Sequence, residues 1–155
     1  MSKQWRCAVV GVSVVGKIHV KVLDQLPNTS LAACCDLLPD RAQSILAEQG
    51  VSGVPVYKDL GEMLAKEKLD VIHLATPSGL HMDPSIQAMQ AGVSVIVEKP
   101  IEILVDRIDR MNEAAKALTR FTGPASHWRT STAWTLWFMT APPPSSFHVP
   151  RQPPC

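Results

Sequence analysis

Short apolar runs alternate with stretches of helical periodicity over the first 118 residues of the chain. The apolar runs have the length of β-strands and lie at residues 6–11, 30–36, 54–58, 70–77 and 93–100. Between and after them, apolar positions recur at helical spacing over 16–26, 39–50, 59–68, 81–92 and 101–118, which predicts helices there.

Individual residues support these helices. Ile18, Val22 and Leu26 follow one another at four-residue spacing, as apolar residues on one helix face do. Pro39 suits the first position of a helix, and Asp59 can cap the first turn of the next one. The last helix carries an apolar stripe of Ile101, Leu104, Val105, Ile108, Met111, Ala115 and Leu118.

Strands separated by helices of this length indicate β-α-β units and a parallel sheet. The run at 70–77 is apolar at nearly every position, as expected for a strand with helices on both faces. Right-handed crossovers then give an α/β fold with a doubly wound parallel sheet of the Rossmann type. Ligands of such sheets bind at the carboxyl ends of the strands.

Residues 119–155 break this pattern. They contain no aspartate or glutamate, three of the four tryptophans and seven of the thirteen prolines of the chain. We therefore expect one domain at 1–118 and an irregular, proline- and tryptophan-rich tail at 119–155. A ligand for an SH3-type groove is an alternative for the tail, and the abrupt change also suggests a truncated or frame-shifted carboxyl terminus.

Composition narrows the class of protein further. The formal net charge of +1 gives no field that would attract nucleic acid or an anionic membrane. No apolar run approaches the ~20 residues that span a bilayer, and the first residues lack a secretory signal, which predicts a cytoplasmic location. Cys7, Cys34 and Cys35 lie in apolar runs and are expected to be reduced, buried thiols.

The turn at "VVGVSVVG" nearly matches the glycine fingerprint of a dinucleotide-binding loop. Gly11 allows the sharp turn and Gly16 a close helix, while Ser13 stands where the second glycine is usual. The amides near Val14, Val15 and Gly16 would hold a pyrophosphate at the helix start. A plain strand-to-helix turn is the alternative.

Asp36 ends the second strand, 20 residues after Gly16, where a carboxylate accepts hydrogen bonds from ribose hydroxyls. Leu37 follows Asp36, and the first arginine after it is Arg41, so no arginine directly follows this carboxylate to neutralise a 2′-phosphate, which favours NAD over NADP as the cofactor. A helix cap before Pro39 is the alternative for this carboxylate.

Two further polar groups end the fourth and fifth strands. Thr76, Pro77 and His81 follow the fourth, and a neutral, ligand-facing imidazole is one interpretation of His81, with a surface histidine as the other. Glu98 and Lys99 end the otherwise apolar fifth strand, either as a solvated ion pair or as groups at the mouth of a cleft.

These motifs, in this order, resemble those of the glucose-fructose oxidoreductase and inositol dehydrogenase family (Gfo/Idh/MocA). The matching runs are "VVGVSVVGKIHVKVL", "CCD", "VYKDLGEML", "DVIHLATPSGLH", "AMQAGVSVIVEKP" and "MNEAAKA", within about residues 5–118. The wording "TPSGLH" with "EKPIEI" is most similar to a branch that oxidises nucleotide-linked amino-uronic acids.

The resemblance implies an NAD(P)-dependent oxidoreductase acting on sugars, sugar acids or cyclitols. It implies that the residues of the first turn face the pyrophosphate and that Asp36 meets the adenosine ribose. It further implies that Thr76, Pro77 and His81 line the nicotinamide side, and that Glu98, Lys99 and Pro100 form a motif whose lysine contributes to catalysis.

The substrate domain of the family has no counterpart here, so we expect a chain with the cofactor-binding half and little activity alone. Surface that meets that domain in relatives could drive self-association. A non-catalytic module for NAD or for a protein partner remains an alternative, as does a methyltransferase of similar topology, which would leave the runs at 75–81 and 97–100 unexplained.

Overall fold

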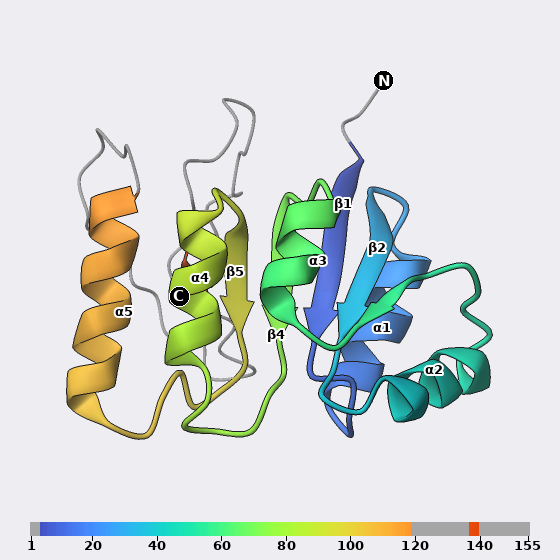
Figure 1. The fold of residues 1–155 in the computed structure, drawn as a ribbon, viewed down its shortest axis with the longest axis horizontal. Helices are drawn as coiled ribbons and strands as arrows, with labels where there is room; N and C mark the ends of the chain where they lie inside the picture. Colours follow the sequence, from blue (N-terminus) through green and yellow to red (C-terminus); the bar gives the residue numbers. More distant parts are fainter. Residues whose placement is uncertain (1–3, 119–136, 140–155) are drawn as a thin grey trace, which may run out of the picture.

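The computed structural model describes residues 4–118 and 137–139, which form a six-stranded sheet with helices on both faces (Figure 1). The strand order is β3-β2-β1-β4-β5-β6, in which all neighbours are parallel except β5 and β6. The strands are β1 (Trp5–Val10), β2 (Thr29–Cys35), β3 (Val56–Tyr57), β4 (Val71–Leu74), β5 (Ser94–Val97) and β6 (Trp137–Met139). The chain crosses from one half of the sheet to the other between β3 and β4, so the order reverses at β1.

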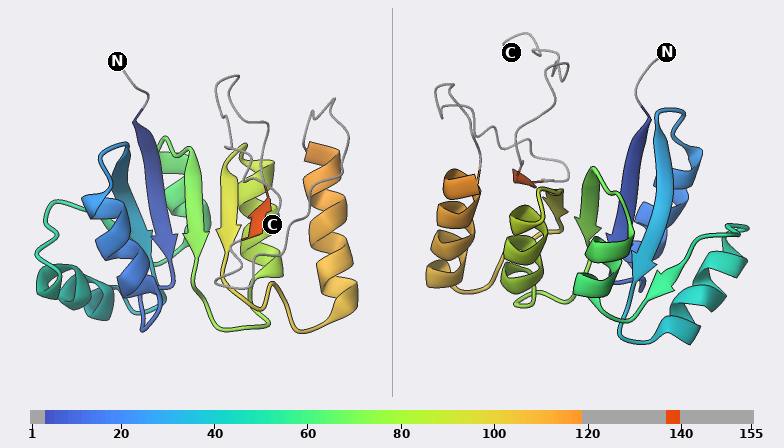
Figure 2. Two further views of the ribbon diagram at one scale, coloured as in Figure 1. Left: turned by 180° about the vertical axis from the view of Figure 1, so that it is seen from behind. Right: turned by 45° about the horizontal axis from the view of Figure 1, so that its top comes forward.

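The helices are α1 (Gly16–Gln25), α2 (Pro39–Glu48), α3 (Leu60–Lys66), α4 (Met82–Gln90) and α5 (Val105–Leu118). Helices α3, α4 and α5 lie in front of the sheet in Figure 1, and α1 and α2 lie behind it (Figure 2). This arrangement confirms the predicted doubly wound α/β fold.

Each face of the sheet has its own core because side chains alternate along the strands. In β1, Ala8 and Val10 pack with Leu74 and with Met63 of α3, whereas Val9 packs on the other face with Val20 of α1. All of these side chains are buried, so both faces of the central strands are covered. Among the described residues, none of the helices has the length and apolar character that spanning a membrane requires.

Several boundary predictions are confirmed. Pro39 occupies the first turn of α2, and Gly50, which follows the end of that helix, has φ of +73°. Asp59 caps α3 by accepting a hydrogen bond from the amide of Glu62 at 2.8 Å.

The predicted helix at 16–26 is present as α1, but the apolar residues at four-residue spacing that indicated it are not its buried face. Ile18, Val22 and Leu26 form an exposed stripe with 58%, 47% and 43% of their surface accessible, while Val20 and Leu23 are buried. The helix is oriented by Gly16, which packs against the backbone of the first turn. Residues four and seven positions further along then face the sheet.

The end of the described chain also departs from expectation. In α5 and just before it, Met111 is buried and Ile101 packs against the core, but Leu104 and Val105 between them are exposed, so the predicted apolar stripe is interrupted at the start of the helix. Residues Trp137–Met139 form β6 beside β5, within a segment expected to be irregular. The proline-rich residues 140–155, to which the SH3-ligand alternative refers, lie outside the described residues.

Candidate functional site

The turn between β1 and α1 is packed backbone to backbone. Gly11 has φ of +87°, and a Cβ on it would lie 2.8 Å from the backbone of Ala75 after β4. A Cβ on Gly16 would collide with the carbonyl oxygen of Gly11. Both glycines are therefore required, and they bring the start of α1 to the carboxyl ends of β1 and β4.

The start of α1 offers unpaired donors to an anion. Its first turn has no acidic residue and no capping side chain. The amides of Val14 and Val15 make no hydrogen bond with other described residues. Helix amides of this kind, with the positive end of the helix dipole, form a binding site for phosphate. Ser13, which is partly buried, contributes a hydroxyl beside them.

Asp36 lies against this turn. Its carboxylate is 7% exposed and accepts hydrogen bonds from the amides of Val12 at 2.8 Å and Leu38 at 2.9 Å. The contact with Leu38 is not a helix cap, because Leu38 is itself the N-cap of α2 and this helix has no side-chain cap hydrogen bond. The contact with Val12 joins the same carboxylate to the glycine turn. Arg41 adds an exposed guanidinium 3.4 Å from Asp36. Carboxylate and open amides thus lie on one edge of the sheet, as a dinucleotide requires.

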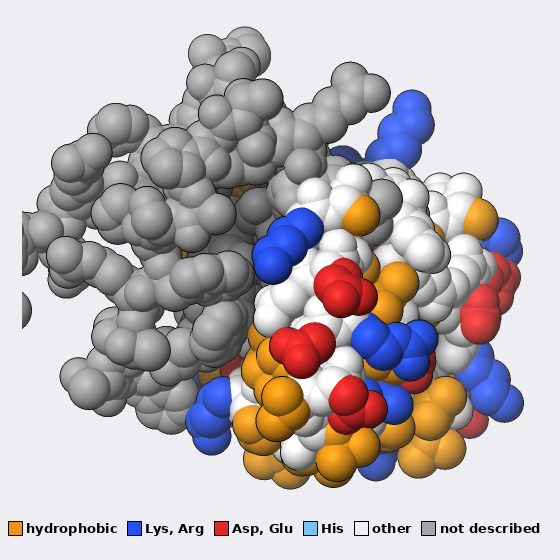
Figure 3. All heavy atoms as spheres, turned by 90° about the vertical axis from the view of Figure 1, so that its left-hand side faces the viewer, with side chains coloured by type: hydrophobic (Ala, Val, Ile, Leu, Met, Phe, Trp, Pro, Cys, Tyr) orange, Lys and Arg blue, Asp and Glu red, His pale blue; other side chains and the backbone are white. Residues whose placement is uncertain are grey.

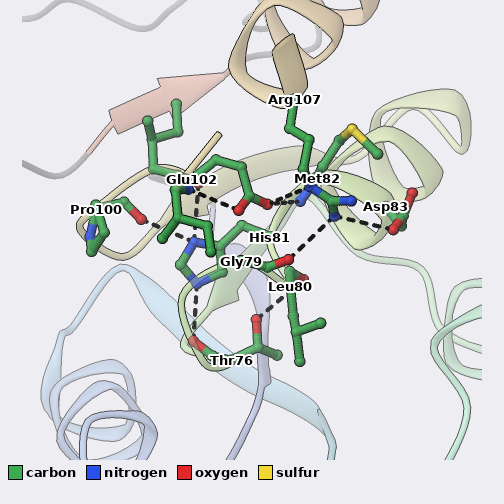
Figure 4. A network of polar contacts seen from close by, with 11 residues as sticks. Thr76, Gly79, Leu80, His81, Met82, Asp83, Pro100, Glu102 and Arg107 are labelled. Carbon is green, nitrogen blue, oxygen red and sulfur yellow. Dashed lines mark hydrogen bonds and ion pairs between the residues drawn. The ribbon is translucent and has the colours of Figure 1, made fainter. Parts of the chain in front are cut away.

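On the other half of that edge, His81 holds two loops together (Figure 4). Its Nε2 lies 2.9 Å from the carbonyl oxygen of Thr76, and its Nδ1 lies 3.1 and 3.0 Å from those of Pro100 and Ile101. The ring is only 1% exposed. His81 is thus not a surface histidine, and every polar contact that its ring makes among the described residues is with backbone oxygen. Thr76 is partly buried and Pro77 exposed in the turn that this ring supports.

Glu102 is the second anchor of these loops. Its buried carboxylate accepts hydrogen bonds from the amides of Met82 at 3.2 Å and Ile103 at 2.9 Å, and Arg107 Nε lies 3.3 Å away. Burial raises the pKa of Glu102, but the two amides and the guanidinium outweigh it and lower the pKa overall. Arg107 also donates to the carbonyl oxygen of Gly79 at 3.2 Å, so the whole turn after β4 is fixed.

Glu98 and Lys99 do not form the solvated ion pair that the sequence left open. Glu98 Oε1 lies 2.8 Å from His19 Nε2, and Oε2 accepts a hydrogen bond from the backbone amide of Lys99 at 3.2 Å. Lys99 is exposed, and its ammonium group has no partner among residues 4–118 and 137–139. An exposed cation at a strand end is available to bind a substrate oxygen.

Two histidines at this site were missed by the sequence analysis. His19 projects from α1 and His73 from β4, and their Nδ1 atoms are 3.0 Å apart. The available signal was weak, because a single polar residue inside the apolar run "VIHL" does not reveal its partners.

Exposed apolar side chains gather at the same edge. The large exposed residues there follow the ends of four parallel strands: Val14, Val15, Leu37, Leu38, Leu80, Ile103, Leu104 and Val105. Figure 3 shows apolar side chains along the lower edge of the face that carries α5. We call these eight residues the apolar rim.

Neither thiols nor metals contribute to the site in the part of the chain described. Cys7, Cys34 and Cys35 are free and buried, as expected, and burial is the main cause that raises the pKa of Cys7 and Cys35 to about 11 and that of Cys34 to about 12. No group of three or more His, Cys, Asp or Glu side chains among the described residues could hold a metal ion.

A glycine turn with open amides, a carboxylate at the end of β2 and a reversal of strand order at β1 define the class of Rossmann-fold dinucleotide-binding proteins. The model of the oxidoreductase family GFO_IDH_MocA, described as having an NAD-binding Rossmann fold, matches residues 5–123. The chain belongs to this family, whose Rossmann fold binds NAD.

The relatives that the chain resembles in sequence carry the names of different enzymes. The chain is 30% identical to scyllo-inositol 2-dehydrogenase (NAD(+)) of Bacillus subtilis over 75% of its own length and 34% of the relative's. It is 31% identical to glycosyl hydrolase family 109 protein 1 of Bacteroides thetaiotaomicron over 66% of its length and 24% of the relative's.

Among solved structures, the WlbA dehydrogenase of Bordetella pertussis in complex with NADH and UDP-GlcNAcA is 31% identical with a TM-score of 0.67. The match covers 76% of this chain and 35% of that one. The chain thus spans about a third or less of the length of these three relatives.

Proposed function

We propose that residues 4–118 bind NAD and present its nicotinamide for oxidation of a hydroxyl group on a sugar, sugar acid or cyclitol. The observation that carries this proposal is the Asp36 carboxylate, which lies 2.8 Å from the Val12 amide of the glycine turn. It brings a ribose acceptor next to a phosphate-binding helix start at one edge of the sheet.

Each part of the edge then has a role. Asp36 accepts hydrogen bonds from the adenosine ribose hydroxyls, and the open amides at Val14, Val15 and Gly16 hold the pyrophosphate, with Ser13 adding its hydroxyl. When bound, NAD supplies the acceptor for the hydride that leaves the substrate carbon.

The part of the carboxyl edge that follows β4 and β5 positions the nicotinamide and the substrate. Thr76 and Pro77 line this side of the cofactor, in the loop that His81 supports from below. Lys99 donates a hydrogen bond to the substrate oxygen, because its exposed ammonium group has no partner among the described residues. Glu98 holds the backbone of Lys99 through its amide.

The 155-residue chain by itself is expected to turn over little substrate. Hydride transfer needs the substrate carbon held against the nicotinamide, and the described residues supply one wall of such a site, bordered by the apolar rim. The same rim supports self-association, which replacement of Leu37 and Val105 by serine should reduce in sedimentation experiments.

The substrate class is proposed from two similarities. The runs "TPSGLH" and "EKPIEI" favour a nucleotide-linked sugar acid, and the WlbA structure with UDP-GlcNAcA is among the more similar ones at 31% identity. A fold does not fix a reaction, however, and one relative carries the name of a glycosyl hydrolase. A module that binds NAD without turnover would make the same contacts to the adenosine and the pyrophosphate of the cofactor.

Calorimetric titration of NADH and, separately, S-adenosylmethionine tests the proposal. We expect saturable NADH binding that weakens at least about tenfold in Asp36→Asn, which loses the charge that the ribose hydroxyls favour. Asp40→Asn is the matched control, because Asp40 is an exposed acidic residue of α2 nearby. Absence of NADH binding, or tighter binding of S-adenosylmethionine, would contradict the proposal.

A further inference from the structure

The Asp36 carboxylate, to which the proposed function assigns the adenosine ribose, is already in contact with three donors. Its Oδ2 accepts a hydrogen bond from the amide of Val12 at 2.8 Å, and its Oδ1 accepts one from the amide of Leu38 at 2.9 Å. Arg41 Nη2 lies 3.4 Å from the same Oδ1. The side chain of Asp36 is 6% exposed, whereas that of Arg41 is 51% exposed.

These three contacts differ in how firmly they are held. The two amides belong to the backbone of the glycine turn and to the N-cap residue of α2, and both lie at ordinary hydrogen-bond length. The contact of Arg41 is long beside the ~2.7 to 2.9 Å of a hydrogen bond between charged groups, and its guanidinium is open to water. Arg41 is therefore the donor that a ligand displaces most easily.

The place of Arg41 in α2 also bears on its role. Arg41 lies in the first turn of this helix, which begins at Pro39, and the positive end of the helix dipole disfavours a cation there. The contact with Asp36 offsets this repulsion and keeps the guanidinium at the end of β2. Arg41 is five positions beyond Asp36 in the sequence, and the first turn of α2 returns it to this carboxylate.

Counting donors shows what each cofactor requires of Asp36. A carboxylate offers about four acceptor positions, so three donors leave one position free. The adenosine ribose of NAD presents its 2′- and 3′-hydroxyl groups as two donors, so the second of them needs the position at which Arg41 lies. In NADP a phosphate replaces the 2′-hydroxyl and accepts hydrogen bonds, so the 3′-hydroxyl takes the free position and Arg41 stays in place.

We propose that Arg41 determines how strongly the site distinguishes NAD from NADP: its guanidinium competes with a ribose hydroxyl of NAD for Asp36 and binds the 2′-phosphate of NADP. This inference rests on the proposed function, since either cofactor must first bind at the glycine turn. A guanidinium carries five N–H donors in one plane, so Arg41 can donate to Asp36 and to a phosphate together. Its charge also offsets the repulsion between that phosphate and the Asp36 carboxylate. The chain should therefore prefer NADH and still bind NADPH.

Calorimetric titration of the 155-residue chain with NADH and, separately, with NADPH tests this role, because the two cofactors differ only in the 2′-phosphate. We expect Arg41→Gln to lower the affinity for NADPH at least about tenfold, through the loss of a charge-assisted contact. The affinity for NADH should stay within about twofold of the native value or rise, because a donor that competes for Asp36 Oδ1 is removed. A general loosening of the site would weaken the binding of both cofactors.

Two further variants and a control sharpen the test. Arg41→Lys keeps the charge but loses the planar group, so it should retain part of the NADPH affinity that Arg41→Gln loses. Asp36→Asn should shift the preference toward NADPH, because it removes the carboxylate that favours the ribose hydroxyls and repels the phosphate. Arg110→Gln is the matched control: Arg110 is an exposed arginine of α5, which lies at the other end of the sheet from α2 (Figure 1), and its loss should leave the ratio of the two affinities unchanged.

Three results would overturn the proposal. An equal loss of NADH and NADPH affinity in Arg41→Gln would show that Arg41 only supports the structure of the site. An unchanged ratio of the two affinities, or the same change in Arg110→Gln, would show that its guanidinium does not act at the 2′ position. Absence of NADPH binding by the native chain would do so as well. The proposed function fails only if NADH itself does not bind, so the two failures are distinguishable.

Discussion

The two halves of the carboxyl edge are built by different means. On the adenosine half, the backbone of the first turn supplies the amides, and two glycines permit its close packing. On the half that we propose for the nicotinamide, side chains hold the loops: His81 contacts backbone oxygens, and Glu102 pairs with Arg107 of α5 (Figure 4). The first half depends on the absence of side chains and the second on their presence.

This difference determines how each half should respond to substitution. Backbone packing cannot relax around an added methyl group, so the adenosine half should fail sharply at its glycines. A network of several side chains loses one contact at a time, so the nicotinamide half should lose stability in smaller steps.

The largest effect is expected for Gly16→Ala. Its methyl group would collide with the carbonyl oxygen of Gly11, which is backbone, so we expect a loss of about 3 kcal/mol or more in the free energy of unfolding measured with urea. Gly92→Ala is the control. Gly92 has φ of +78° and no atom within 4 Å of an added Cβ, so it should lose only about 1 to 2 kcal/mol. Equal losses would show that the first turn is not tightly packed.

The next effect concerns Glu102→Gln on the nicotinamide half. The substitution keeps the shape but leaves the Arg107 guanidinium without its buried countercharge, and we expect a loss of about 2 kcal/mol in the same assay. Glu62→Gln, at an exposed ion pair, should change stability less. If the two variants were equally stable, the network would not hold the loops.

A smaller effect should appear as a pH dependence. The pKa of His73 is about 4 in the folded chain and near 6.5 when unfolded, so the unfolded state binds more protons between these values. Stability should therefore fall as the pH drops from 6.5 to 4, and His73→Gln should remove about 2 kcal/mol of that fall. Identical pH profiles for the variant and the native chain would contradict the burial of a neutral His73.

The smallest effect is expected for Ser13→Gly, which restores the usual glycine where a pyrophosphate approaches the backbone. NADH affinity should rise a few-fold, corresponding to about 1 kcal/mol or less. Calorimetric titration measures this change in NADH affinity. Weaker binding by the variant would indicate that the hydrogen bond of the Ser13 hydroxyl favours NADH binding more than its Cβ hinders it.

The same contrast explains what the sequence could predict. The glycine turn, Asp36 and the Asp59 cap are local patterns, and the structure bears out their positions. His81 and Pro100 are 19 residues apart in the chain, so their contact arises only from the packing of two loops. His19 and His73 are 54 residues apart, and no local pattern joins them.

The inward face of α1 shows a further limit of sequence patterns. Four-residue spacing indicates a helix but not which face is buried, and α1 has a second apolar set at Val20 and Leu23. The packing of Gly16 against the first turn decides between them.

Backbone amide NMR during titration with NAD is the sharpest test of whether the start of α1 and Asp36 hold the adenosine diphosphate of the cofactor, because it reports on the first turn residue by residue. We expect the largest shifts at Val14 and Val15, with a smaller one at Val12, and we expect Asp36→Asn to diminish all three. Saturable binding with unperturbed amides at the start of α1, or no binding at any concentration, would show that this helix start does not hold the cofactor.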